Sequence, residues 1–185
     1  NKPESILYKI KGILPNFIKK PIKYFLYFYL SQMEYLQLYF ETKNKSYLKW
    51  YQEHCDNKIE KMVLTKDSKN TGNIDLNLCK KQGLKPHHTL FEFGCGYLRA
   101  GHIFIKYLEK FNYTGADTSG NRIEFGRKEL LGNTDKKPLF ITSNSNSLDW
   151  LNNKKYDYIY THSVFAHMPF EDVKEVLLNM KNKVM

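Results

Sequence analysis

The chain has 185 residues, of which 42% are hydrophobic. This is enough for one globular domain with a core, or one domain with an appendage, and it excludes disorder throughout. The formal net charge is +10, but 26 of the 29 basic residues are Lys and only 3 are Arg. Because Arg makes the bidentate contacts that read phosphates and bases, its scarcity argues against sequence-specific nucleic-acid recognition.

Cysteine usage and the N-terminal sequence bear on the compartment. Cys55, Cys79 and Cys95 are odd in number and lack a C-x-x-C or Cys/His spacing, so neither a disulfide framework nor a metal site is indicated. The sequence lacks the order of charged region, apolar region and cleavage site that is typical of a secretory signal. A reducing cytoplasm fits these features best. Because the first residue is Asn1, we expect the segment to belong to a longer gene product.

The first 50 residues are rich in Lys and aromatic residues and contain one strong helix signal. Ile22–Phe40 places apolar side chains on one stripe at spacings near 3.6, which predicts a helix. Polar residues such as Lys23 and Glu34 interrupt the stripe, so the helix is not expected to cross a bilayer. Two roles stay open: residues 17–40 contact an anionic membrane surface, or the helix packs on the following domain or on a second subunit.

A change of composition predicts where the folded domain begins. A helix is expected over residues 46–64, a polar loop over 65–73 and a short helix over 75–82 that ends at Gly83. We therefore predict a helical, aromatic and Lys-rich extension over residues 1–73 and a folded domain over residues 74–185.

The segment LFEFGCGYLRAG reads as a strand, a tight loop and a helix start. Gly94 and Gly96 allow a turn that side chains would block, and they let backbone N–H groups approach a bound ligand. A dinucleotide fingerprint would have its third glycine at position 99, where this chain has Arg99, so nicotinamide binding is disfavoured. Glu92 ends the strand, where a carboxylate can meet the ammonium group of a ligand.

The rest of the domain alternates between strand and helix patterns. Strands are expected over residues 113–117, 138–142 and 156–161, and helices over residues 98–110 and 121–131 and from Pro169 onward. This alternation predicts a mostly parallel sheet with right-handed crossovers, and a ligand at the carboxyl ends of the strands.

Polar side chains end two of these strands. Asp117 follows Gly96 by 21 residues, about the separation at which a carboxylate reaches ribose hydroxyls in a βαβ nucleotide site. The alternative is that Asp117 is an acid at a helix N-terminus near Ser119. After the third strand, the side-chain amides of Asn144 and Asn146 either read the edge of a ligand ring or belong to a plain loop.

Three segments together resemble the class I S-adenosylmethionine-dependent methyltransferases: FEFGCG, YTGADTSG and YDYIYTHSVFAHMP. The resemblance covers about residues 75–185 and implies an α/β, Rossmann-like, doubly wound and mostly parallel sheet. That family's sheet has seven strands and this chain supplies four. We therefore expect the domain to be C-terminally incomplete, with further strands or another chain covering the edge of strand four.

The resemblance also implies how S-adenosylmethionine would be held. The backbone of Gly94, Cys95 and Gly96 would line the methionine part of this cofactor, and Glu92 would face its ammonium group.

The adenosine part would be held by residues from the next two strands. Asp117 would hold the ribose hydroxyls, Thr118 would border the adenine, and Asn144 or Asn146 would approach the adenine amino group. The family more often has an acid in the loop after strand three, where this chain has the two Asn residues.

Thr161 and His162 would lie beside the sulfonium. Methyl transfer is an in-line displacement with a good leaving group, so a base is needed only where the acceptor must lose a proton. His162, His167, His102 and Tyr160 are the candidate bases. His162 is the one placed between cofactor and acceptor, where it either acts as the base or only borders the pocket, whereas His167 reads as structural. Two functions stay open: methyl transfer to an O or N atom of a small molecule or glycan, or a non-catalytic scaffold that binds a membrane or protein partner through its N-terminal helix.

Overall fold

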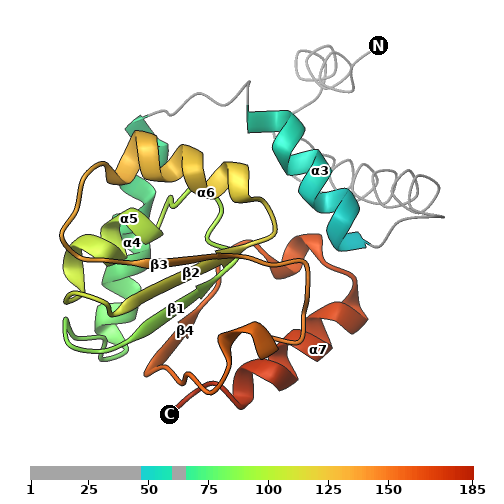
Figure 1. Ribbon diagram of the computed structural model, residues 1–185. Helices are drawn as coiled ribbons and strands as arrows, with labels where there is room; N and C mark the ends of the chain where they lie inside the picture. The colour runs from blue at the N-terminus through green and yellow to red at the C-terminus, as the bar shows by residue number, and fades with distance from the viewer. Residues whose placement is uncertain (1–46, 60–65) are drawn as a thin grey trace, which may run out of the picture. The chain divides into compact units, whose positions relative to one another are not determined.

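A four-stranded parallel sheet forms the centre of the protein (Figure 1). The structure is a computed structural model and describes residues 47–59 and 66–185. The strands are β1 (Leu90–Phe93), β2 (Tyr113–Asp117), β3 (Leu139–Thr142) and β4 (Tyr158–Tyr160), in the order β3-β2-β1-β4. All three neighbouring pairs are parallel, so the predicted Rossmann-like sheet is confirmed.

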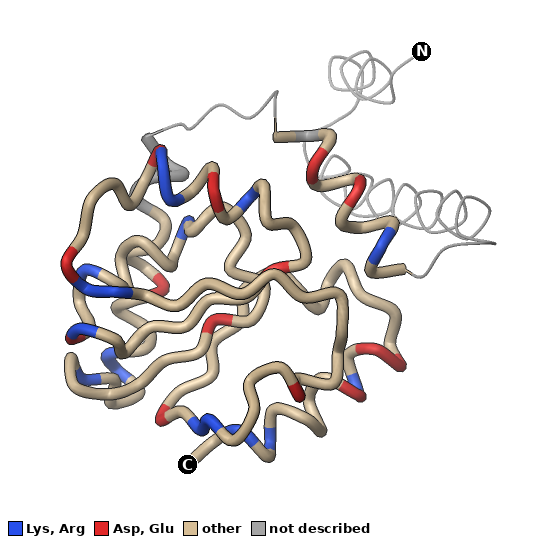
Figure 2. Tube along the Cα trace, in the orientation of Figure 1, with Lys and Arg blue, Asp and Glu red and all other residues tan. Residues whose placement is uncertain are grey.

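Helices cover both faces of this sheet. They are α3 (Tyr47–Ile59), α4 (Lys66–Lys81), α5 (Gly101–Tyr107), α6 (Gly120–Gly126), which continues as a π-helical turn over Arg127–Leu131, and α7 (Phe170–Lys181). Figure 1 shows α4, α5 and α6 on one face and α7 on the other. Figure 2 shows that α7 begins with acidic residues and ends with basic ones, the arrangement that the helix dipole favours.

The two faces have separate cores because successive strand residues point in opposite directions. Leu90 belongs to the cluster that contains Phe104 and Leu108 around α5, and all three side chains are fully buried. Phe91, the next residue, belongs to the opposite cluster with Val176 of α7. Strand β1 is therefore buried on both sides, and its carboxyl end is held at a fixed position between two packed layers.

Asp157, a residue of the YDYIY segment, joins the beginnings of β1 and β4. Its Oδ2 accepts hydrogen bonds from the backbone N–H of Thr89 at 2.7 Å and from the Thr89 hydroxyl at 2.8 Å. The backbone N–H of Asp157 donates back to the Thr89 hydroxyl at 3.1 Å. The hydrogen bond from the Thr89 backbone lowers the pKa of Asp157. Asp157 therefore fixes the register of β4 against β1. It lies at the amino-terminal ends of these strands, away from their carboxyl ends.

The predicted loop over residues 65–73 is wrong, because α4 begins at Lys66 and includes the short helix that we expected to begin at residue 75. The sequence suggests that Gly72 belongs to a loop, but it lies within α4, where the helix contacts the backbone of residues 99 and 100. A Cβ there would lie 2.5 Å from the carbonyl oxygen of Arg99 and 3.0 Å from the Cα of Ala100. Gly72 therefore lets α4 approach the segment before α5, which propensity alone does not show.

The described residues form one compact unit, Tyr47–Met185. The predicted domain boundary between residues 73 and 74 falls within α4, and the division into extension and domain stays a prediction. The predicted helix over residues 22–40, with its membrane or subunit contact, lies outside the described residues. Among the helices that the structure describes, none has the length and apolar character needed to cross a bilayer.

Strand β4 lies at the edge of the sheet. Tyr156, just before β4, forms one parallel bridge with Val184. The backbone N–H of Tyr156 donates to the carbonyl oxygen of Lys183 at 2.8 Å. The backbone N–H of Met185 donates to the carbonyl oxygen of Tyr156 at 3.0 Å. Residues 183–185 thus pair with Tyr156 next to the start of β4.

Candidate functional site

An open cavity lies at the carboxyl ends of the strands, where the sequence predicts a ligand. Its volume is about 1100 Å³, including solvent at its mouth. Eight of the predicted site residues line it: Glu92, Gly94, Cys95, Gly96, Asp117, Thr118, Asn146 and His162. Asn144 and Thr161 are not among the lining residues; Asn144 is exposed, and the buried hydroxyl of Thr161 has no hydrogen-bond partner among the described residues.

The backbone N–H groups of the glycine loop point into the protein, not toward the cavity. Those of Gly94 and Cys95 both donate to the carbonyl oxygen of Ala116, at 2.8 and 2.9 Å. The N–H of Gly96 donates to Asp117 Oδ2 at 2.8 Å. Our expectation that these N–H groups would serve a ligand therefore does not hold for the structure described. The loop contributes its shape, fixed against β2.

Both glycines have a left-handed backbone, and at Gly94 space is limiting as well. Gly94 has φ +74°, and a Cβ there would lie 2.2 Å from Val164 Cγ2. Gly96 has φ +52°, and a Cβ there would lie 2.7 Å from Arg122 Nη2. The left-handed backbone disfavours other residues at both positions. The glycines thus let Val164, from the segment after β4, and Arg122, from α6, pack directly on the loop.

Asp117 has one of the two roles that the sequence left open, that of an acid at the N-terminus of α6, and it also lines the cavity. Its Oδ2 accepts the Gly96 N–H, and its Oδ1 accepts the N–H of Ser119 at 2.9 Å. Ser119 is the N-cap of α6, and its hydroxyl accepts the N–H of Arg122 at 3.1 Å. Because each carboxylate oxygen can accept two hydrogen bonds, Asp117 keeps acceptor capacity on the cavity side. It therefore organises both loops and can also bind ligand hydroxyls.

Glu92 is 4% exposed, and its Oε2 accepts a hydrogen bond from the Tyr113 hydroxyl at 2.6 Å. Burial raises the pKa of Glu92 to about 8; the hydrogen bond from Tyr113 lowers it, and the charge of Asp75 raises it. At pH 7 the ligand-free carboxyl is therefore mostly protonated. A cation brought to this wall of the cavity would favour its ionised form.

His162 follows β4 and meets one polar group of β4 and two from other segments. Its Nδ1 lies 3.1 Å from Asp75 Oδ1 of α4, 2.9 Å from Arg99 Nη2 and 3.1 Å from the Tyr160 hydroxyl. Asp75 is 5% exposed, whereas the side chain of His162 is 42% exposed. Sequence reasoning missed Asp75, because it lies 87 residues before His162 and no local pattern links the two.

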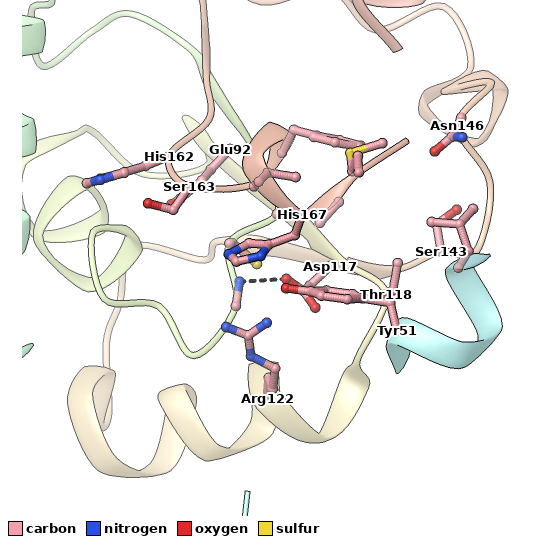
Figure 3. Close-up of a pocket in the computed structure, with 18 of the residues that line it drawn as sticks. Tyr51, Glu92, Asp117, Thr118, Arg122, Ser143, Asn146, His162, Ser163 and His167 are labelled. Atoms are coloured by element: carbon pink, nitrogen blue, oxygen red, sulfur yellow. Dashed lines mark hydrogen bonds between the residues drawn. The ribbon is translucent and has the colours of Figure 1, made fainter. Parts of the chain in front are cut away.

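The opposite end of the cavity has hydroxyl and amide groups. Figure 3 shows Glu92 and His162 toward one end, Asp117 and Thr118 between, and Ser143 and Asn146 toward the other end. The buried Thr118 Oγ1 and Asn146 Oδ1 have no hydrogen-bond partner among the residues that the structure describes. Such groups are costly unless a ligand or water satisfies them.

Helix α3 forms part of the cavity wall, which the sequence did not predict. Tyr47, Leu48 and Tyr51 line the cavity, and the Tyr51 ring stacks on the His167 imidazole with centroids 6.2 Å apart. Burial raises the pKa of Tyr51 to about 12, so its phenol stays neutral. His167 therefore lies at the cavity, although its segment alone reads as structural.

Two polar contacts attach α3 to α6. The Ser119 hydroxyl donates to Asp56 Oδ1 at 2.5 Å, and Arg122 Nη1 donates to Cys55 Sγ at 3.5 Å. In Figure 3 the guanidinium of Arg122 points toward Asp117 and Tyr51. No sequence signal identifies Arg122, because its position depends on a contact with Cys55 of α3. Cys55 lies 67 residues earlier in the chain.

Residues 91–184 match the family described as methyltransferase domain. This is half of the chain, and the fold and cavity agree with it, so the chain belongs to the methyltransferase-domain family. Within that family it has the class I, Rossmann-like fold of the S-adenosylmethionine-dependent enzymes. The predictions of an enzyme with S-adenosylmethionine as its cofactor are confirmed at this level. The non-catalytic scaffold gains no support.

Solved structures share the fold at low sequence identity. The magnesium protoporphyrin IX methyltransferase ChlM of Synechocystis PCC 6803 with bound SAM has a TM-score of 0.61 and 14% identity, with 77% of this chain and 74% of that chain covered. A second structure is phosphoethanolamine N-methyltransferase 1 of Haemonchus contortus in complex with phosphoethanolamine and S-adenosylhomocysteine. It has a TM-score of 0.58 and 14% identity, with 75% of this chain and 30% of that chain covered.

The glycopeptide N-methyltransferase MtfA gives a TM-score of 0.51 and 11% identity, covering 65% of this chain and 54% of that chain. This chain thus spans less than two thirds of MtfA and of the Haemonchus enzyme. A comparison with curated protein sequences gives no significant match.

Proposed function

We propose that the protein transfers a methyl group from S-adenosylmethionine to an oxygen or nitrogen atom of a small molecule or glycan. The observation that carries this proposal is the order of groups along one cavity: the acid Glu92, the acid Asp117, and then the hydroxyl and amide of Thr118 and Asn146. The cofactor has an ammonium group, a ribose diol and an adenine in the same order.

The residues fit this cofactor chemically. Glu92 ionises to meet the ammonium group, and the free lone pairs of Asp117 accept from the ribose hydroxyls. Thr118 and Asn146 supply the unsatisfied polar groups for the adenine end. The cofactor supplies a methyl group on a good leaving group, so the protein needs to orient the acceptor and exclude water. Tyr51 and His167 help to close the cavity on the side of α3.

The acceptor class draws support from structural relatives. Two of them are named for action on a porphyrin and on a glycopeptide, and a third is bound to phosphoethanolamine. These acceptors differ in size and charge, but none is a nucleic acid or a folded protein. We infer a small-molecule or glycan acceptor, in keeping with the Arg-poor composition of the chain.

Calorimetry with S-adenosylmethionine and S-adenosylhomocysteine tests the cofactor site. We expect one site with micromolar affinity, on the order of −8 kcal/mol. Transfer of a labelled methyl group to a panel of hydroxyl, carboxyl and amine acceptors then tests the reaction. Absence of binding to either compound, in protein that melts cooperatively, would contradict the proposal.

We further infer a cytoplasmic protein whose residues 17–40 contact an anionic membrane surface or a second subunit. The three cysteines are free, as in a reducing compartment. Sedimentation with vesicles that contain or lack an anionic phospholipid tests the membrane contact, and light scattering tests the subunit contact. Binding to neither vesicle and a monomeric mass would contradict both.

A further inference from the structure

One ring nitrogen of His162 lies within hydrogen-bond distance of three side chains. The Oδ1 and Oδ2 atoms of Asp75 lie 3.1 and 3.2 Å from Nδ1, Arg99 Nη2 lies 2.9 Å from it, and the Tyr160 hydroxyl lies 3.1 Å from it. Among the described residues, none hydrogen-bonds to the other ring nitrogen, Nε2. The proton position on His162 is therefore decided at Nδ1.

Asp75 and Arg99 favour opposite forms of the neutral imidazole. An ionised carboxylate only accepts, so Asp75 favours the form in which Nδ1 carries the proton and Nε2 has a free lone pair. A guanidinium only donates, so Arg99 favours the form in which Nδ1 accepts and Nε2 carries the proton. The Tyr160 hydroxyl donates its proton to Asp75, so toward Nδ1 it can only accept, which also favours the Nδ1–H form. Only the first form can take a proton at Nε2.

Burial favours the form that Asp75 requires. Asp75 is 5% exposed, and its carboxylate also accepts a hydrogen bond from Tyr160. A buried carboxylate that loses one of its few donors is more costly than a partly exposed guanidinium that loses one of its five N–H contacts. Arg99 lines the cavity, where water or a ligand can accept its N–H groups. Groups facing this cluster are Glu92 of β1, Cys79 and Asp75 of α4, Tyr160 of β4, and Arg99.

We propose that Asp75 is a positioning residue that holds His162 with its proton on Nδ1, so that Nε2 takes the proton of a hydroxyl acceptor. This rests on the proposed function and narrows it to O-methylation. The acceptor oxygen forms a bond to the methyl carbon as the methyl–sulfur bond breaks and its electron pair stays on sulfur. The hydroxyl proton moves to Nε2, Asp75 stabilises the resulting imidazolium, and water later removes the proton.

Nitrogen NMR of the full chain tests the proton position without turnover. Long-range proton–nitrogen spectra distinguish the two neutral forms, and His162→Asn identifies the His162 signals among those of the six His residues. We expect the Nδ1–H form in the wild type and in Arg99→Gln, and the Nε2–H form in Asp75→Asn, whose amide can donate to Nδ1. An Nε2–H wild type would overturn the proposal even if Asp75→Asn did not fold.

A matched pair of variants strengthens the comparison. Arg99→Gln removes the competing donor, whereas Asp75→Asn removes the accepting carboxylate at nearly constant volume. If Arg99→Gln changed the proton position and Asp75→Asn did not, Arg99 would control His162 and the proposal would be wrong.

Kinetics provide the second measurement. Asp75→Asn should lower kcat for a hydroxyl acceptor by about tenfold or more, while S-adenosylhomocysteine affinity stays within about twofold. A neutral amine needs no base before attack, so its rate should change little. Equal losses for both acceptors would overturn the assignment. If the wild type bound no S-adenosylhomocysteine, the proposed function would fail instead, whatever the NMR result.

Discussion

The backbone N–H of Gly96 donates to Asp117 Oδ2 across 2.8 Å, so the acid that ends β2 also holds the glycine loop that follows β1. The residue we expect to bind ribose thus shapes the neighbouring part of the same site. A substitution at Asp117 therefore changes both the loop and the ligand contact, and the two effects must be measured separately.

We expect Asp117→Ala to weaken S-adenosylhomocysteine binding by about 1 to 3 kcal/mol, since it removes the acceptor of the ribose hydroxyls. The free energy of unfolding should fall too, because the N–H groups of Gly96 and Ser119 lose their partner. Calorimetry and thermal unfolding measure the two effects. Asp157→Ala is the control, because it removes the hydrogen bonds to Thr89 at the other end of the sheet and leaves the cavity unchanged. A loss of stability with unchanged affinity would leave Asp117 a purely structural role.

Cofactor binding should release a proton from Glu92. The pKa of this buried carboxyl is about 8, so at pH 7 it must ionise before it can face an ammonium group. Affinity should rise with pH up to about 8 and then level. Calorimetry in buffers of different ionisation enthalpy measures how many protons are released on binding. Glu92→Gln keeps an acceptor for Tyr113 and should bind more weakly without this release. Equal proton release by both proteins would contradict the role of Glu92.

The same carboxyl should shape the stability of the ligand-free protein. Its pKa in the folded state lies above the usual value of 4.5, so the folded state binds more protons between about pH 4.5 and 8. The free energy of unfolding should therefore fall as pH rises through this window. In Glu92→Gln, the free energy of unfolding measured with urea should depend less on pH over this window. A slope as steep as that of the wild type would assign the pH dependence to other groups.

Gly94→Ala should destabilise the protein more than Gly132→Ala. Both glycines have positive φ, but a Cβ at Gly94 would lie 2.2 Å from Val164 Cγ2, whereas nothing lies within 4 Å of one at Gly132. Gly132→Ala should cost roughly 1 to 3 kcal/mol from the backbone alone, because φ +64° and ψ −154° lie in a region that is essentially restricted to glycine. Gly94→Ala should cost roughly 1 to 3 kcal/mol more from the clash. In urea unfolding, Val164→Ala should recover part of the second cost; equal costs at both glycines would exclude the clash.

Asp56→Ala should loosen α3, because it removes the acceptor of the Ser119 hydroxyl. We expect faster amide hydrogen exchange in residues 47–59 and an affinity for S-adenosylhomocysteine about fivefold lower, since α3 lines the cavity. Asn57→Ala changes an exposed residue of the same helix and should alter neither measurement. Slower or unchanged exchange in Asp56→Ala would show that other contacts hold α3.

The sequence predicts the sheet well because its signals are local. The strand expected over residues 113–117 agrees with β2, where an apolar run ends at an acid and a new helix begins. Glu92 and Asp117 could be identified because each ends such a strand. Their hydrogen-bond partners could not be predicted in the same way, since the glycine loop turns its N–H groups toward Ala116 and Asp117.

Contacts between distant segments account for what the sequence does not show. Gly72 marks a helix contact and not a loop, because the backbone before α5 lies against it. Asp75 reaches His162, and Asp56 reaches Ser119, across 87 and 63 residues. Periodicity describes one element at a time, so it identifies none of these pairs.

The inward-facing amides of the glycine loop have a consequence for binding entropy. The N–H groups of Gly94, Cys95 and Gly96 are satisfied by β2 before any ligand arrives, so the loop takes its final shape during folding. A ligand then has little chain to order at this wall, and its affinity benefits from a preorganised surface. Substitutions that loosen the loop without touching the ligand will therefore weaken binding through the entropy of the unbound protein.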